Sequence, residues 1–491
     1  MRTESPLNIE KYDYCVIGAG VAGLNALAVA RSYLPASARV LLVDRRPREG
    51  GMWTDTYDYV RLHQPHRMFT AGDIPWSTHR APEYLADKSE VLSHLAECLE
   101  ACEQNYSLET RFGSEFVSSS EEQIDGIWLA NIELREIATG ETIRIRARRC
   151  MKAFGFRVPQ NPPLLLDSSG VNSITPDGDD LYSEAFSNST GPCFIVGGGK
   201  TAMDTATNIM NRFPHKRVSM IVGRGTVFLN RDKTFHRGLK RWLGGETTLE
   251  GFLRLALLYN GENETEVMDY FKQHMSIQLD DEFENYFFGI LSERENDKIK
   301  TGLDSLIKDY LVDVKDGESS PRIEFRSGQT MDIPSGSWII NCTGYIARQE
   351  HDYEPYLSQH ATTVSVQPTS GIHFLTTFGA YFLAHLHFLD LLPKLKLYEL
   401  DYQSLLRKNK NGFAFTAISH TMYNILLILD AVPSSVFTRC GLDFDNWFPL
   451  YRRFLGGMKL RLNNAAYRDR FRAALDKVQG RYQIRCGELR T

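Results

Sequence analysis

The sequence has no CxxC motif, no surplus of basic residues and no uninterrupted apolar run long enough to cross a membrane. Its eight cysteines are dispersed along the chain, which is typical of a reducing compartment and not of a disulfide scaffold. The closest two, Cys98 and Cys102, lie one helical turn apart. That spacing favours a buried helix face over a redox or metal site.

The absence of a basic surplus also limits the partners that we expect. Lys and Arg number 56 against 61 Asp and Glu, so the net charge is -5 and nucleic acid is not an expected partner. The N-terminal residues contain no apolar stretch of the secretory type. The richest apolar run, residues 374–392, is interrupted by Gly, His and Asp. We therefore expect a cytoplasmic protein with no integral membrane segment.

What the chain does have is the size and composition of a globular protein of several domains. Its 491 residues are 42% hydrophobic and 24% charged. Roughly 150 residues per domain gives about three domains, with enough chain to bury a substantial core.

The strongest signal is a nucleotide-binding pattern that occurs twice. In the first copy, the apolar run YDYCVI precedes Gly18-x-Gly20-x-x-Gly23, an Ala-rich segment and a second apolar run that ends at Asp44. This order predicts a strand, a tight turn, a helix and a second strand. Gly20 lets the backbone approach a pyrophosphate at the helix N-terminus, and Asp44 lies where a carboxylate binds ribose hydroxyls. We expect a dinucleotide here and include the adjacent Arg45 in the candidate site.

The second copy reads GPCFIVGGGKTAMD. It places Gly197-x-Gly199-x-x-Ala202 between a predicted strand and a predicted helix. Lys200 and Thr201 open that helix and belong to the same candidate site. Two such units in one chain predict two dinucleotide cofactors.

The residue after the second strand distinguishes the two units. The position that corresponds to Asp44 holds Gly223, and Arg224 follows it. No carboxylate would repel a 2′-phosphate there, and a guanidinium is placed to pair with one. Arg231 and Lys233 could add to that charge, although a solvated basic loop is the alternative. The first unit therefore suits FAD and the second suits NADPH.

Further along the same regions, the chain resembles the flavin-containing monooxygenases and their Baeyer–Villiger and N-hydroxylating relatives. The matching segments occur in the family's order. They are GGMW (Gly51, Met52, Trp53), VRLHQPHRMFTAGDIPW, the crossover segment KAFGFRVPQNPP, and NCTGY (Thr343, Gly344). The resemblance implies FAD, NADPH, molecular oxygen and a small-molecule substrate, with oxidation through a flavin C4a-(hydro)peroxide.

The chain departs from the family's pattern in ways that affect the expected chemistry. The FxGxxxHxxxW fingerprint is missing from VNSITPDGDDLYSEAFSNSTG. Its absence favours oxidation at nitrogen, or at sulfur, over attack on a ketone. The sequence has no pair of neighbouring cysteines that could relay electrons, which disfavours disulfide reduction.

Two histidines are candidate catalytic residues. A gapless alignment to the family places His63 where many members carry a flavin-side Asn, and His66 at a Lys position. His63 could donate a hydrogen bond to a flavin peroxide, or hold the nicotinamide or the substrate. A buried histidine with satisfied hydrogen bonds is the alternative. His66, with Arg61 and Arg67, would favour an anionic substrate if it faces the flavin; a solvated loop is equally compatible.

The predicted fold is α/β, with two Rossmann-like dinucleotide-binding domains, a helical insert and a helical C-terminal region. We expect the FAD domain over 1–160 with a return segment at 341–400, the NADPH domain over 161–340, its helical insert at about 232–312, and the C-terminal helices over 401–491. The insert and the C-terminal helices are expected to line the substrate pocket.

Other readings of the sequence stay open. Baeyer–Villiger oxidation, an NADPH-dependent flavin reductase or oxidase, and a non-enzymatic redox-responsive interaction module all fit the two glycine motifs. A homodimer is one option for the assembly. His385 and His387 lie two apart on a predicted helix and do not share a face, so we expect no metal site.

Overall fold

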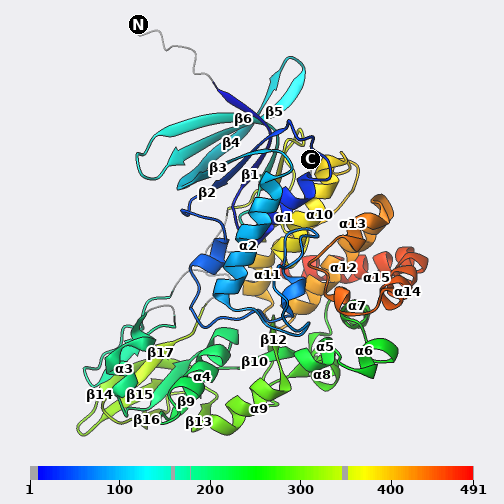
Figure 1. Ribbon diagram of the computed structural model, residues 1–491. Coiled ribbons are helices and arrows are strands. Elements are labelled where there is room, and N and C mark those ends of the chain that lie inside the picture. Colours follow the sequence, from blue (N-terminus) through cyan, green and yellow to red (C-terminus); the bar gives the residue numbers. More distant parts are fainter. Residues whose placement is uncertain (1–8, 156–160, 177–178, 345–351, 490–491) are drawn as a thin grey trace.

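A computed structural model describes residues 9–155, 161–176, 179–344 and 352–489. Parts of three segments used above lie outside these residues: FRVPQ in the crossover, Asp177 and Gly178 in VNSITPDGDDLYSEAFSNSTG, and Tyr345 in NCTGY. The structure contains two nucleotide-binding units, one below the other in Figure 1, with a group of C-terminal helices at their side.

The first unit is built on a mixed seven-stranded sheet. Its order is β3-β2-β1-β6-β5-β4, with β18 also paired to β6. The strands are β1 (Glu10–Ile17), β2 (Arg39–Asp44), β3 (Ser107–Phe112), β4 (Ser114–Ile124), β5 (Ile127–Glu136), β6 (Thr142–Lys152) and β18 (Thr363–Ser365). The strands β1, β2, β3, β6 and β18 run parallel, so the chain returns to this sheet after leaving the second unit.

The helix α1 (Val21–Ala30) is buried along its whole length. It packs between the first sheet and α10 (Thr376–Phe388), while α2 (Lys88–Glu103) lies alongside it. A helix that is apolar all round is stable only inside a protein, which explains why the Ala-rich sequence lies here. The N-terminus of α1 consequently faces the carboxyl end of the parallel strands.

The second unit repeats this arrangement with a five-stranded parallel sheet in the order β13-β9-β8-β17-β7. Its elements are β7 (Val171–Ile174), α3 (Glu184–Asn188), β8 (Cys193–Val196), α4 (Lys200–Arg212), β9 (Val218–Ile221), β13 (Ser305–Ile307) and β17 (Ser337–Asn341). An antiparallel sheet of β14 (Leu311–Asp316), β15 (Pro321–Phe325) and β16 (Thr330–Asp332) covers one face. The predicted α/β fold with two Rossmann-like units is confirmed.

The insert between β9 and β13 contains strands as well as the helices that were expected. Its elements are β10 (Thr226–Asn230), α5 (Arg231–Thr234), α6 (Leu239–Leu243), α7 (Thr248–Leu258), α8 (Glu264–His274), β11 (Ser276–Ile277), β12 (Asn285–Leu291) and α9 (Glu293–Gly302). The expectation of a helical insert is wrong for residues 285–291, because β12 pairs in parallel with β10. Gly289 makes this approach possible, since a Cβ there would lie 2.8 Å from the ring of Phe228.

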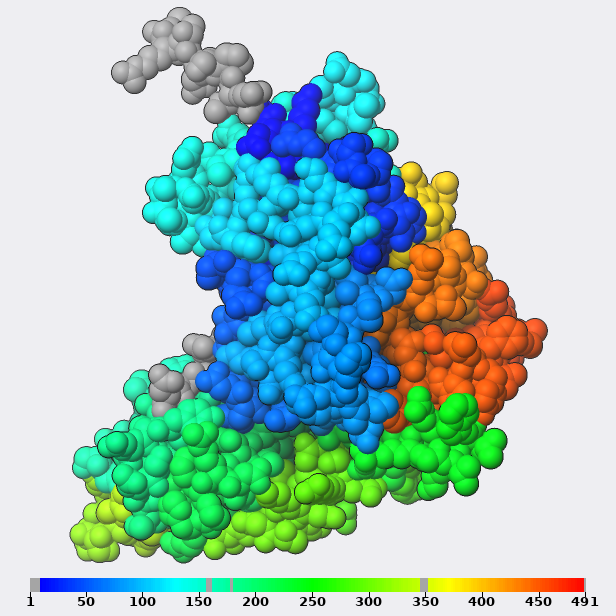
Figure 2. All heavy atoms as spheres, in the orientation of Figure 1, coloured from blue at the N-terminus to red at the C-terminus, as the bar shows by residue number. Residues whose placement is uncertain are grey.

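The C-terminal region is helical, as predicted. Its elements are β19 (Tyr398–Leu400), α11 (Tyr402–Lys408), α12 (Phe413–Ala431), α13 (Ser434–Thr438), the short 3₁₀ helix η5 (Phe444–Trp447), α14 (Leu450–Leu462), α15 (Asn464–Tyr482) and β20 (Cys486–Glu488). These helices share one core with the insert and the second sheet. In Figure 2 the orange and red C-terminal surface adjoins the green surface of the insert.

The most apolar of these helices, α12, is long and apolar enough to cross a membrane by length and composition. However, 83% of its apolar window is buried inside the protein, against α7, α15 and β12. It therefore serves as the central helix of the C-terminal core.

All eight cysteines are buried and unbridged. Cys15 and Cys150 face each other across β1 and β6. A hydrogen bond to Cys150 and burial hold the pKa of the Cys15 thiol above its usual value, so it does not ionise as a redox thiol must. Among the residues described, no group of three His, Cys, Asp or Glu side chains is placed to hold a metal ion.

Candidate active site

The turn between β1 and α1 has the geometry of an anion site. Gly18 adopts φ +109°, and a Cβ there would lie 2.7 Å from the carbonyl oxygen of Ala153 at the end of β6. Gly20 caps α1, and no side chain accepts a hydrogen bond from the first turn of that helix. Since these N–H groups need an acceptor, the turn is suited to a phosphate.

A second glycine segment closes over this turn. Gly51 opens the 3₁₀ helix η1 (Gly51–Thr54) at φ +57°, and a Cβ there would lie 2.7 Å from the Cα of Gly20. Trp53 in the same segment packs edge-on against Phe69, with ring centroids 5.4 Å apart, whereas Met52 is exposed. The structure thus brings the GxGxxG and GGMW motifs into backbone contact.

The carboxylate of Asp44 is buried at the end of β2. It accepts hydrogen bonds from the backbone N–H groups of Ala19 (2.6 Å) and Arg46 (2.8 Å). These bonds fix the turn, and each oxygen keeps a second acceptor position for a ribose hydroxyl. Arg45 is exposed beside it.

The second unit repeats the first in detail. Gly197 adopts φ +132°, and a Cβ there would lie 2.6 Å from the carbonyl oxygen of Cys342, just as Gly18 approaches Ala153. Among the described residues, no side chain accepts a hydrogen bond from the first turn of α4, which Gly199 caps, and no atom lies within 4 Å of where a Cβ of Gly199 would be. Space for a pyrophosphate therefore exists above this helix N-terminus.

The other predicted residues of the second unit lie around this turn. Ala202 is buried in α4, and Thr201 is half-buried in the first turn. Thr343 donates a hydrogen bond to the side-chain oxygen of Asn341 (2.7 Å) at the end of β17. Gly344 follows at φ +81°.

Arg224 follows β9, at the position where the sequence predicts a residue that binds the 2′-phosphate of the ribose. Its guanidinium is half-exposed and contacts the carboxylate of Glu284 (3.3 Å) and the side-chain oxygen of Asn411 (2.7 Å). A 2′-phosphate at this position would compete with Glu284 for the same charge.

Arg231 lies elsewhere, in the seam between the two units. Its Nε donates a hydrogen bond to the backbone oxygen of His63 (2.7 Å), and its Nη1 pairs with Glu295 (2.6 Å). The side chain is buried, and it shares no partner with Arg224. Arg231 already pairs with Glu295 in the seam, and its contribution to the NADPH site stays a prediction.

His63 is held in this seam as a neutral imidazole. Burial lowers the pKa of His63 to about 3, and the positive charges of Lys200 and Arg231 act in the same direction. Burial opposes the ionisation of Glu295, but Lys200 and Arg231 outweigh it and hold the pKa of Glu295 at about 2. The ring can therefore donate one hydrogen bond and accept one at neutral pH.

His66 is in a different environment. It is fully buried in the 3₁₀ helix η2 (His66–Met68), where its ring meets Trp76 and Tyr84 edge-on. Its Nδ1 lies 3.2 Å from the backbone oxygen of Tyr84, and burial lowers its pKa. This side chain lies in the core, apart from the seam residues around His63.

Several residues that connect the two units were not predicted from the sequence, because they belong to no motif. The hydroxyl of Tyr57 donates to Asp204 (2.9 Å), and that of Tyr59 lies 2.8 Å from the hydroxyl of Thr205. Asp204 also pairs with Lys200. These contacts hold the segment before His63 against α4, next to a polar cavity of about 340 Å³.

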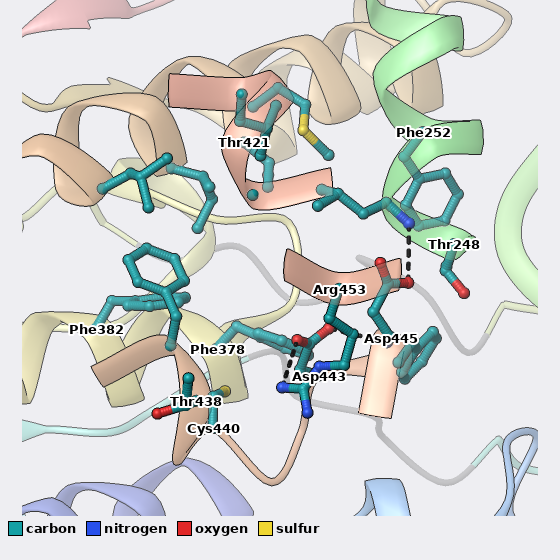
Figure 3. A pocket seen from close by; sticks show the side chains of 18 of the residues that line it. Thr248, Phe252, Phe378, Phe382, Thr421, Thr438, Cys440, Asp443, Asp445 and Arg453 are labelled. Atoms are coloured by element: carbon teal, nitrogen blue, oxygen red, sulfur yellow. Dashed lines mark hydrogen bonds and ion pairs between the residues drawn. The ribbon is translucent and has the colours of Figure 1, made fainter. Parts of the chain in front are cut away.

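A larger, mostly apolar cavity of about 580 Å³ lies among helices of the insert, the return segment and the C-terminal region (Figure 3). The helices α7, α10, α12, α13 and α14 form its walls. The insert and the C-terminal helices were expected to line a pocket, whereas α10 belongs to the predicted return segment of the FAD domain. Its aromatic lining consists of Phe252, Phe374, Phe378, Phe382, Phe437, Phe444 and Phe454. The cavity extends to residues 373–375, just before α10, and Thr376 of that helix contacts Gly155 after β6.

His373 in this wall was not anticipated. Burial lowers the pKa of His373 to about 3, and its ring stacks on Phe378 at 5.0 Å. The N–H of Leu375 donates to its Nδ1 (3.0 Å), so the neutral ring carries its proton on Nε2. No sequence motif surrounds this histidine, so the sequence alone could not predict its place in a cavity.

The cavity also holds two acidic side chains. Asp445 accepts a hydrogen bond from the N–H of Leu249 (3.1 Å), and Asp443 lies 3.6 Å from the guanidinium of Arg453 (Figure 3). Burial raises the pKa of both carboxyl groups. They form a polar side in an otherwise apolar space.

The N-terminal part of the chain is similar to a known family of domains. Residues 12–245 match the model described as pyridine nucleotide-disulphide oxidoreductase. The match includes both glycine turns, and it is consistent with FAD and NADPH as the two nucleotides.

Curated relatives align with only part of the chain. An uncharacterized protein of Mycobacterium tuberculosis strain H37Rv is 29% identical over 218 residues, which are 41% of this chain and 36% of that protein. The Mycobacterium bovis relative has the same values. The chain thus spans about a third of the length of these relatives.

Solved structures with a similar fold are distant in sequence. Cyclohexanone monooxygenase from Rhodococcus sp. Phi1, bound to NADP+, is 11% identical, with 94% of this chain and 99% of that chain covered at a TM-score of 0.49. Flavin-containing monooxygenase from Stenotrophomonas maltophilia is 12% identical, with 79% and 99% covered at a TM-score of 0.46. Bacillithiol disulfide reductase from Staphylococcus aureus is 12% identical, with 79% and 99% covered at a TM-score of 0.43.

Proposed function

We propose that this protein is an FAD- and NADPH-dependent monooxygenase that oxidises an apolar small molecule at nitrogen or sulfur. The observation that carries the proposal is the combination of two glycine-capped helix N-termini, one in each unit, with an apolar cavity lined in part by α10, the helix that packs on α1 of the first unit. Nucleotides bound at the two turns would approach each other across the seam between the units, and the cavity would hold the substrate.

The residues at both turns fit the proposed cofactors. Gly18, Gly20 and Gly51 leave bare backbone where the FAD pyrophosphate would lie, and Asp44 has acceptor positions for its ribose. In the second unit, the open space at Gly199 and the exposed guanidinium of Arg224 suit NADPH. NADPH would supply a hydride and the reduced flavin would activate oxygen.

The protein itself would contribute orientation and a dry environment. The neutral rings of His63 and His373 can donate hydrogen bonds to the reacting groups without bringing a charge into the site. The phenylalanine lining of the cavity would bind an apolar substrate and exclude water.

The acidic pair favours an amine as substrate. A protonated amine would be attracted to Asp443 and Asp445, and it must lose a proton before its nitrogen can be oxidised. A carboxylate whose pKa is raised by burial can accept that proton. This supports nitrogen before sulfur as the oxidised atom.

The test is a screen of apolar amines and sulfides for NADPH consumption, under isotopically labelled dioxygen, with mass analysis of the products. A product that carries one labelled oxygen atom supports the proposal, and a lactone or ester would indicate Baeyer–Villiger oxidation instead. If all electrons from NADPH appear as hydrogen peroxide with every substrate, the protein is an oxidase. If NADPH does not reduce the bound flavin, the non-enzymatic interaction module is the better account.

A further inference from the structure

Exposed apolar side chains are concentrated on one part of the surface, formed by α6 and α14. These helices have 5 and 13 residues, yet they carry nine of the sixteen large hydrophobic side chains that are exposed among the described residues. The nine are Leu239, Trp242, Leu243, Leu450, Tyr451, Phe454, Leu455, Met458 and Leu462. A contiguous apolar surface of this kind marks an interaction site.

The two helices form one surface, because side chains of α14 are bonded to the backbone of α6 and the loop after it. The hydroxyl of Tyr451 donates to the carbonyl of Trp242. Arg452 donates to the carbonyls of Gly244 (2.8 Å) and Gly245 (2.6 Å). We call this region the α6–α14 surface.

The exposed apolar residues of α14 lie on one side of the helix, with basic residues at the edges. At about 100° per residue, its exposed apolar residues fall on one stripe, opposite the buried Leu460. Lys459 lies just beyond one edge of that stripe, and Arg461 lies just inside the other edge, between Leu450 and Phe454. An apolar stripe with basic residues at its edges is typical of helices that lie in a membrane interface.

The charge of this surface differs from that of the whole protein. The two helices contain six Lys and Arg residues and no acidic residue, although the chain has a net charge of -5. Within the described residues, Lys240, Lys459 and Arg461 have no acidic partner. Such a surface is complementary to anionic lipid headgroups.

We propose that the α6–α14 surface binds an anionic lipid bilayer, with the apolar stripe at the level of the headgroups and Trp242 as an interfacial anchor. A second copy of the chain fits less well, because a two-fold contact would bring basic residues against basic residues. The lipid surface is the occupant that satisfies both the apolar and the charged side chains.

Binding in this way would also explain where the large cavity opens. Leu450, Phe454 and Met458 are exposed on the α6–α14 surface and also line the cavity. The same helix therefore forms both the outer surface and the rim of the cavity. An apolar compound dissolved in the bilayer could enter without crossing water.

The test is co-sedimentation of the full-length, FAD-loaded protein with phosphatidylcholine vesicles, with and without about one third phosphatidylglycerol. We expect binding to the anionic vesicles that weakens as salt is raised. Two double variants probe the surface: Phe454→Ser with Leu455→Ser, and Lys459→Glu with Arg461→Glu. Each basic residue near such a surface contributes about fivefold to binding, so the charge reversal should weaken it by more than about tenfold.

Matched controls are Ile127→Ser with Ile137→Ser, and Lys315→Glu with Arg322→Glu, which change exposed residues on other elements. They should bind as the parent does, and all variants should keep FAD and their melting temperature. The proposal is overturned if the parent binds both vesicle types equally weakly, or if control and test variants lose binding alike. It is also overturned if light scattering shows a dimer that the Phe454 and Leu455 variant dissociates, because a second copy then covers the surface.

Discussion

His63 lies near two positive charges, and this environment decides what its ring can do. Burial is the main reason that the imidazole is neutral, Lys200 and Arg231 lower its pKa further, and Arg231 donates to the His63 backbone oxygen. We predict that His63→Ala still binds FAD and oxidises NADPH but releases more hydrogen peroxide per NADPH. Losing one hydrogen-bond donor beside the reacting oxygen should cost about 1–3 kcal/mol, which shifts the partition between product and peroxide about tenfold or more.

The matched variant is His63→Asn, which restores a neutral donor and should recover part of the coupling. His373→Ala tests the second neutral donor in the same assay, at the cavity wall. If His63→Ala couples oxygen as well as the parent, His63 does not face the reacting groups. If it loses FAD, the residue is structural.

Arg224 is the second residue whose contacts lead to a quantitative test. The contact with Glu284 holds its guanidinium in place but also occupies its charge. We predict that Arg224→Ala raises the KM for NADPH about tenfold or more, because a charge-assisted contact worth about 1.5–3 kcal/mol is lost, while NADH use stays nearly unchanged. Glu284→Gln should lower the KM for NADPH by removing the competing carboxylate.

Steady-state kinetics with both coenzymes check this prediction, with Arg322→Ala as an exposed, ion-paired control. If Arg224→Ala raises the KM for NADPH and for NADH equally, Arg224 does not bind the 2′-phosphate.

At the scale of elements, the two glycine turns are equivalent in sequence but differ in their surroundings. A Cβ at Gly20 would lie 3.5 Å from the Cα of Gly51, whereas a Cβ at Gly199 would meet nothing within 4 Å. We predict that Gly20→Val yields colourless protein, because the added methyl groups would collide with Gly51 and fill the space of the pyrophosphate. Gly199→Val should stay yellow yet lose NADPH-driven reduction of its flavin.

The ratio of flavin absorbance to protein absorbance, followed by anaerobic titration with NADPH, measures both effects. The two variants serve as controls for each other, since each changes one unit only. A fully yellow Gly20→Val protein would contradict the assignment of FAD to the first unit.

Elements also show where local sequence was insufficient. The strands and helices at both glycine motifs follow from local pattern, because buried parallel strands are continuous apolar runs and glycine marks the turns. Residues 285–291 have apolar spacing that fits a helix, but β10 provides a pairing partner and the segment becomes β12. Tertiary pairing of this kind overrides local preference.

At the scale of the whole molecule, burial opposes the protonation of most of the described histidines, and this makes the stability of the fold depend on pH. Burial lowers the pKa to about 3 or 4 for His63, His94, His373, His385, His387 and His420. Below pH 6.5 the unfolded chain binds protons at these residues, while the folded protein does not until about pH 4. Stability therefore falls as the pH falls through this window, by about 2 kcal/mol for each such residue at pH 5.

We predict that the melting temperature drops steeply between about pH 7 and about pH 5, as measured by differential scanning calorimetry. Replacing His385 with Gln should reduce the difference between the two pH values, because one residue that resists protonation is removed. Replacing the exposed His79 with Gln should leave it unchanged. A melting temperature that is flat over this range would contradict the burial of these rings as neutral groups.

The sequence by itself determined the two nucleotide-binding units, because each depends on local chemistry: a buried strand, glycines that only a tight turn requires, and a helix whose N-terminus is left without a cap. It also marked Asp44 and Arg224 by their distance from those turns. Only the tertiary structure decided which residues meet in the seam, since Arg231, Glu295 and Lys200 come from separate elements that surround His63. The cavity and the α6–α14 surface are likewise products of tertiary packing, because side chains distant in sequence create them and no local pattern encodes that proximity.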